Sequence, residues 1–78
     1  MRNRGTDTIA LKKVAVERGL DKISDLAKAS GINRNTLSGV LKGDVQPSAE
    51  VMSKLIETLD ISPSQAGVIF FSNNLRSA

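Results

Sequence analysis

The sequence contains no cysteine and no histidine. Their absence excludes disulfides, thiolate nucleophiles and imidazole bases, and it removes the ligands that most transition-metal sites use. Only Asp, Glu, Lys, Ser and Thr chemistry would remain for an enzyme, and no pair of them is placed so that one activates the other. A chain of 78 residues also buries too little surface for a deep catalytic cleft. We expect one domain, residues 1–78, with no catalytic residue, no metal and no cofactor.

Long hydrophobic runs are also missing. The longest unbroken apolar run covers residues 68–71, whereas a membrane-spanning helix needs about 20 apolar residues. Residues 1–10 lack the apolar centre of a signal peptide. The sequence therefore predicts a soluble, cytoplasmic protein that does not bind a membrane.

Basic residues are concentrated in the first part of the chain. Residues 1–43 hold nine Lys and Arg against four Asp and Glu, whereas residues 44–78 hold two against four. This asymmetry is typical of a protein whose first part faces a polyanion. Solvated helix surfaces in a mildly basic protein would give a similar count, so both interpretations stay open at this point.

Every periodic segment of the sequence has helical spacing, and none alternates as a strand does. The pattern predicts five short helices, at about residues 8–18, 22–29, 33–42 and 48–59 and from residue 62 onward. The expected N-cap residues are Asp7 or Thr6, then Asp21, Asn33, Ser48 and Ser62. The last start is the clearest, because Pro63 and Gln65 follow Ser62 as in a capping box. The predicted fold class is all-α, a compact bundle of about five short helices.

Residues 22–42 match a helix-turn-helix, two helices joined by a short turn that contains a glycine. A small residue lets the helices cross closely, the glycine can adopt a left-handed conformation, and apolar side chains anchor the second helix. The matching residues are Leu26, Ala27, Gly31, Ile32, Leu37 and Val40. Two core helices separated by a glycine would give the same pattern, which is the alternative interpretation.

The outward side of the second of these helices contains no acid. It consists of Asn33, Arg34, Asn35, Ser38 and Lys42. In the major groove Arg pairs bidentately with guanine and Asn with adenine, whereas an acid would be repelled by phosphate. A merely solvated helix surface usually contains Glu or Asp. The composition therefore favours base-edge contacts from Asn33, Arg34, Asn35 and Ser38.

The stretch LAKASGINRNTLSGVLKGDVQPS, followed by the helix ending at Leu59, resembles the phage-repressor-like helix-turn-helix family, the Cro and xenobiotic-response-element type of DNA-binding regulators. The resemblance implies a lambda-repressor-like five-helix domain that binds a palindromic operator in double-stranded DNA, usually as a homodimer. It implies base-edge contacts from the start of the helix at about residues 33–42, which we call the reading helix. It also implies phosphate contacts from Lys22, Lys42 and Ser48.

Three features depart from the family pattern, the last of them involving two positions. Ile23 replaces the usual Gln at the start of the second helix, and Gly39 occupies a place from which some relatives read a base. Many relatives pair an Arg of the first helix with a Glu of the third, whereas this chain has Ala15 and Leu41 there. Because an orphan buried charge is costly and a double apolar replacement is often neutral or better, the coupled change supports the alignment.

The tail, about residues 62–76, contains the only two aromatic residues and is a possible dimerisation segment. Its apolar run is Val68, Ile69, Phe70 and Phe71. These side chains either cover the base of the bundle or pack against a second copy. Four consecutive apolar residues exceed what one face of a short helix hides, and polar residues follow them. We therefore expect at least one of them to face outward, in a patch at the edge of the fold that forms a homodimer.

Three functions fit these features. The first is a sequence-specific transcriptional regulator, a repressor of the phage or mobile-element type. The second is an antitoxin that binds both its operator and a toxin partner. The third, a protein-binding module that does not touch DNA, agrees poorly with the basic first half of the chain.

Overall fold

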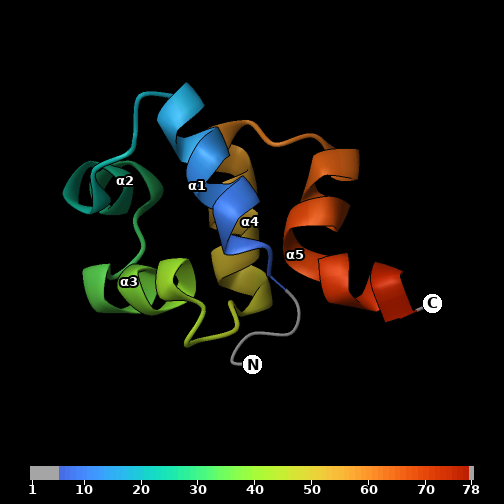
Figure 1. Cartoon of the computed structure of the whole chain (residues 1–78). Coiled ribbons are helices and arrows are strands. Elements are labelled where there is room, and N and C mark those ends of the chain that lie inside the picture. The colour runs from blue at the N-terminus through green and yellow to red at the C-terminus, as the bar shows by residue number, and fades with distance from the viewer. Residues whose placement is uncertain (1–5, 78) are drawn as a thin grey trace.

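The part of the chain that the structure describes folds into five helices. A computed structural model describes the backbone of residues 6–77 and the side chains of residues 6–71. The helices are α1 (Thr8–Glu17), α2 (Ile23–Ser30), α3 (Arg34–Lys42), α4 (Ala49–Leu59) and α5 (Pro63–Ser77), and the described residues contain no strand (Figure 1). The prediction of an all-α bundle is confirmed.

Four of the five helix starts are capped by the predicted side chains. In each case the side-chain oxygen accepts a hydrogen bond from a backbone amide that has no partner inside the helix. Ser62 and Gln65 form a reciprocal capping box, in which the Ser62 Oγ accepts from Gln65 N at 3.2 Å and the Gln65 Oε1 accepts from Ser62 N at 3.4 Å. The other capping residues are Asp7, Asn33 and Ser48.

The predicted cap of α2 is wrong. The helix begins at Ile23 and its N-cap position is Lys22, which makes no side-chain cap hydrogen bond. Asp21 lies one residue too early to occupy the cap position. The start of α2 is therefore set by packing of Ile23 and Leu26 against the core rather than by a cap.

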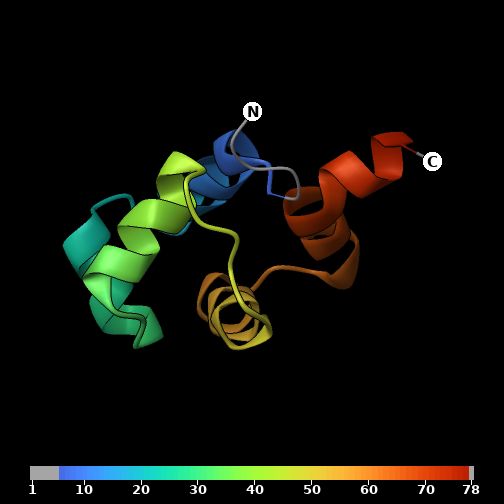
Figure 2. The same ribbon diagram turned by 90° about the horizontal axis from the view of Figure 1, so that it is seen from below.

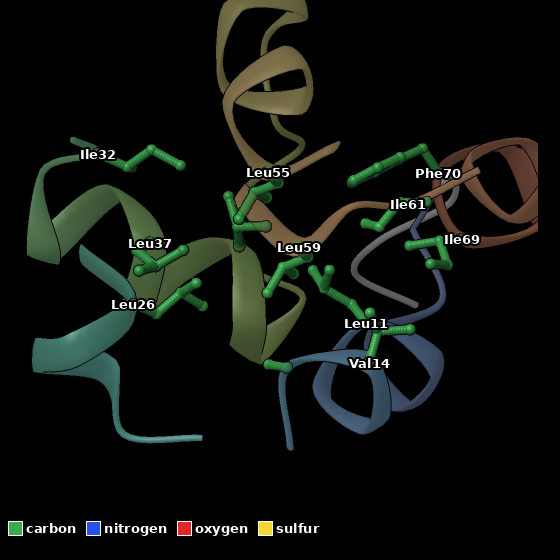
Figure 3. Close-up of a cluster of buried hydrophobic side chains, with 12 residues drawn as sticks. Leu11, Val14, Leu26, Ile32, Leu37, Leu55, Leu59, Ile61, Ile69 and Phe70 are labelled. Carbon is green, nitrogen blue, oxygen red and sulfur yellow. The ribbon is translucent and has the colours of Figure 1, made fainter. Parts of the chain in front are cut away.

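The core lies where all five helices meet (Figure 3). Seven side chains are less than 2% exposed, and they come from every helix: Leu11, Leu26, Leu37, Val40, Leu55, Leu59 and Phe70. Burial of one such side chain is worth about 1.5–3 kcal/mol. The Cα radius of gyration, 11.4 Å, agrees with the value of about 11.5 Å that scaling gives for a compact domain of this length.

Two layers of helices flank the centre of the bundle. α2 and α3 lie on one side and α5 on the other, with α1 and α4 between them (Figures 1 and 2). A backbone hydrogen bond from Asp7 N to Ile69 O, 2.6 Å long, joins the chain before α1 to α5. α3 and the tail are therefore on opposite sides of the fold (Figures 1 and 2).

An arginine closes the C-terminal end of α4. The Arg18 side chain donates from Nε to the Leu59 carbonyl at 2.7 Å and from Nη2 to the Asp60 carbonyl at 3.3 Å. A guanidinium at this end satisfies carbonyls that have no helical partner and complements the helix dipole. Arg18 is thus used inside the fold, although it counts toward the basic first half of the sequence.

The tail does not leave the helix after the aromatic pair. The α5 backbone continues to Ser77 and kinks at Phe71, where φ is −133° and ψ is 27°. The helix predicted from residue 62 onward thus extends through the polar residues that follow the apolar run. The kink turns the last part of α5 away from the line of its first part (Figure 2).

Candidate nucleic-acid interface

The turn between α2 and α3 has the geometry that the motif requires. Gly31 is left-handed, with φ 75° and ψ 15°, which glycine adopts without a steric penalty. The buried Ser30 hydroxyl donates to the Leu26 carbonyl at 2.7 Å, and Oγ accepts from Ile32 N at 3.3 Å. The predicted turn is confirmed, and Ser30 strengthens it in a way that the sequence did not indicate.

Buried side chains fix the orientation of α3. Leu37 and Val40 are 0% exposed and Ile32, just before the helix, is 5% exposed. Leu41 packs against the same core while partly buried. Because these residues occupy one side of a 3.6-residue period, the opposite side of α3 faces outward.

The outward side of α3 carries polar and basic groups that the rest of the fold leaves available. Arg34, Asn35 and Lys42 are exposed, and Ser38 is half-buried beside them. Within the described residues, no hydrogen bond or ion pair engages these four side chains. α3 contains no acid, and the next acid in sequence, Asp44, lies beyond its end and interacts within the chain. The surface can donate hydrogen bonds and attract anions.

Asn33 has another role. Its Oδ1 accepts from Asn35 N at 2.8 Å and from Thr36 N at 3.4 Å, so it caps α3. A bidentate contact with adenine needs both the oxygen and the nitrogen of the amide. Asn33 therefore cannot make that contact without giving up the cap, whereas the Asn35 amide is not used in this way. The predicted set of base-reading residues narrows to Arg34, Asn35 and Ser38.

The glycine of the reading helix is covered by the loop that follows. A Cβ built on Gly39 would lie 2.7 Å from Val45 Cγ2 and 3.3 Å from Val45 Cβ. The Gly39 carbonyl accepts from Asp44 N at 2.9 Å and from Val45 N at 3.2 Å. Close approach of Val45 thus explains why position 39 carries no side chain, and no sequence pattern indicates this contact.

Of the phosphate-contact candidates, Lys42 and Ser48 lie at the two ends of the same loop. Lys42 is exposed at the end of α3. The Ser48 Oγ accepts from Val51 N at 3.2 Å and caps α4, which leaves its hydroxyl proton available for a phosphate. The dipole of α4 adds partial positive charge at this point.

Lys22, for which the resemblance implies a phosphate contact, has two acidic residues near it in sequence. It is exposed at the N-cap of α2. The exposed acids Asp21 and Asp25 lie on either side of it in sequence, and Asp25 is in the first turn of α2. These charges oppose phosphate binding there, so we expect Lys22 to contribute less than Lys42.

The tail segment splits into two pairs of residues. Ile69 and Phe70 are 2% and 0% exposed, so they belong to the chain's own core and are not available as direct contacts for a second copy. Val68 and Phe71 are 50% and 43% exposed, which confirms that part of the run faces outward. The split follows from α5 being helical, since Val68 and Phe71 are three residues apart and share one side of the helix, whereas Ile69 and Phe70 lie on the other. The side chains of residues 72–76 lie outside the described ones.

A groove of about 340 Å³ runs between α1 and α5. Val14, Val68 and Ile69 lie along it, and Lys13 and Glu17 of α1 line it together with Ser64 and Gln65 of α5. The lining thus combines apolar side chains with polar and charged ones, as surfaces that bind another protein often do. Val68 thus lies both in the groove and among the exposed apolar residues.

The coupled apolar change that supported the alignment agrees with the packing. Ala15 is 4% exposed, and Leu41 packs against the core. A single charge at position 15 would be buried without a partner, and one at position 41 would be partly buried, so either alone would be destabilising.

Among the described residues, none of the helices reaches the length and apolar character that crossing a membrane requires.

No curated protein and no solved structure matches the chain. A family model described as helix-turn-helix matches residues 11–65, from α1 into the first turn of α5. The match covers most of the chain and includes the turn and reading helix described above. The chain therefore belongs to the Cro/C1-type helix-turn-helix family, the xenobiotic-response-element family of DNA-binding regulators.

Proposed function

We propose that the protein is a repressor of the phage or mobile-element type that binds a palindromic operator through α3. The observation that carries this proposal is the outward face of α3, which combines Arg34, Asn35, Ser38 and Lys42 without an acid. The core holds this helix rigidly, since Leu37 and Val40 are 0% exposed. Rigid placement lowers the entropy cost of binding, so the polar groups meet base edges in a fixed register.

Two groups on this face match base edges in the major groove. Arg34, in the first turn of α3, can pair with the O6 and N7 of guanine, and Asn35 with the N6 and N7 of adenine. Lys42 and Ser48 would hold the sugar-phosphate backbone on either side of the loop. Arg34 is therefore the residue whose loss should change sequence preference most.

We propose further that the protein binds as a homodimer through Val68 and Phe71. One reading helix contacts too few base pairs for useful specificity in a genome. A two-fold dimer places two such helices about 34 Å apart, in successive major grooves. The two exposed side chains and the groove beside α1 supply an apolar surface for a second copy.

Selection from a pool of random duplexes tests the proposal. The wild-type protein should enrich a palindromic sequence, and Arg34→Ala should weaken binding to it by about 1–3 kcal/mol while leaving binding to random DNA nearly unchanged. Lys12→Ala, an exposed charge of α1, is the matched control and should have little effect on specificity. Equal losses on the selected and random duplexes would make Arg34 a phosphate contact instead.

A further inference from the structure

Position 39 lies in the middle of the proposed reading face. It follows Asn35 by four residues and precedes Lys42 by three, so the three positions lie on one side of the helix. Asn35 and Lys42 are exposed there. Gly39 itself offers no side chain to DNA, and the place that its Cβ would take is covered by the isopropyl group of Val45, whose Cγ2 would lie 2.7 Å from such a Cβ.

Val45 is held in this place from both ends of its loop. Gly43 is left-handed, with φ 83°, and turns the chain back after α3. The Asp44 and Val45 amides then donate to the Gly39 carbonyl. Beyond Val45, the buried Pro47 and the Ser48 cap fix the chain at the start of α4. Although it is a loop residue, Val45 therefore has a defined position against α3.

The side chain remains 43% exposed, so it packs against the helix and still presents methyl groups outward. An isopropyl group makes no hydrogen bond and gains nothing from a phosphate. Of the groups at base edges in the major groove, the C5 methyl of thymine is the apolar one. Contact with any other base edge would remove water from a donor or acceptor without replacing its hydrogen bond.

We propose that Val45 reads a thymine methyl and so takes the place of the side chain that Gly39 lacks. The specificity of the reading face is then shared between α3 and the loop after it. The inference rests on the proposed function, because it names one base that the same face recognises. It predicts that each half-site contains a thymine near the bases that Asn35 and Lys42 approach.

The test uses the duplex selected from a random pool by the wild-type protein. Thymidines are replaced one at a time by deoxyuridine, which removes only the methyl group. One thymidine in each half-site should cost the wild type about fourfold in affinity, the change that corresponds to about 0.8 kcal/mol for one buried carbon. Val45→Ala should lose this difference, binding thymidine and deoxyuridine duplexes equally at that position.

Gly39→Ala gives an independent measurement on the same contact, because its new Cβ would push Val45 aside while leaving Val45 in the sequence. It should also reduce the methyl effect, and Lys12→Ala should retain it in full. A deoxyuridine scan in which wild type and both variants respond alike would overturn the inference and leave the proposed function standing. Failure of the wild type to enrich any sequence would instead refute the proposed function, and the inference with it.

Discussion

Replacing Gly39 by alanine tests how tightly the loop packs on the reading helix. In an ordinary helix interior, Gly→Ala stabilises the fold by about 0.5–1 kcal/mol, because alanine loses less backbone entropy on folding. Gly39 has no special backbone conformation that would oppose the change, since the positive-φ glycines are Gly19, Gly31 and Gly43. Any departure from this gain must come from the neighbour that the new Cβ meets.

That neighbour is Val45. The new Cβ would lie 2.7 Å from Val45 Cγ2 and 3.3 Å from Val45 Cβ. Both separations are shorter than an ordinary contact of about 3.5–4.0 Å between carbons, so Val45 must rotate or its loop must shift. A β-branched side chain is stiff about χ1, and leaving its rotamer costs about 0.5–1.5 kcal/mol. We expect this cost to cancel the gain, so that Gly39→Ala leaves the stability of the wild type nearly unchanged.

Removing the Val45 methyl groups separates the two effects. In a Val45→Ala background the Cγ2 contact is absent, and Gly39→Ala should stabilise the fold by about 0.5–1 kcal/mol. For a domain of this length, 1 kcal/mol corresponds to about 4–8 °C in Tm. The four proteins form a double-mutant cycle, measured by urea unfolding followed by circular dichroism. A full stabilisation by Gly39→Ala in both backgrounds would refute the packing of Val45 on α3.

Four further variants address the scaffold, the backbone contact and the tail. Gly31→Val should destabilise the fold by about 1–2 kcal/mol through its left-handed conformation alone, since no atom lies within 4 Å of a Cβ there; an unchanged Tm would contradict the turn geometry. Lys42→Ala should lower affinity for all duplexes equally and reduce the salt slope by about one unit per protomer, and an unchanged slope would remove Lys42 from the phosphate backbone. Phe70→Ala should lower the free energy of unfolding by about 3–5 kcal/mol at any protein concentration. The double variant Val68→Ser with Phe71→Ser should stay folded but lose self-association and operator binding, as measured by sedimentation without and with the operator duplex. A wild type that sediments as a monomer on a full palindromic duplex would refute the dimer.

The parts of the fold that sequence alone predicted are those set by interactions over a few residues. The caps at Asn33, Ser48 and Ser62 each involve amides two or three positions away, and the turn at Gly31 depends on one residue's backbone conformation. Helical spacing likewise predicted which side of α3 is buried. Local chemistry therefore sufficed to place the helix-turn-helix and its outward face.

The features that the sequence did not predict depend on residues far apart or on the exact direction of a helix. Arg18 closes α4 across 41 positions, and a count of charges assigned it to the basic surface. Val45 reaches Gly39 only because the left-handed Gly43 turns the loop back. The division of the tail into a buried and an exposed pair required the orientation of α5 against the core, which the run of four apolar residues does not reveal.

The most direct test of the account is a competition titration at fixed salt between the selected palindromic duplex and a scrambled duplex of the same composition. Specific regulators bind their sites about 10³-fold or more tightly than random DNA, and we predict a ratio of at least this size for the wild type. Arg34→Ala should weaken binding to the palindrome by about 1–3 kcal/mol while leaving binding to the scrambled duplex nearly unchanged, so the ratio of the two affinities should fall. Equal affinity of the wild type for the two duplexes would contradict the claim that α3 reads sequence.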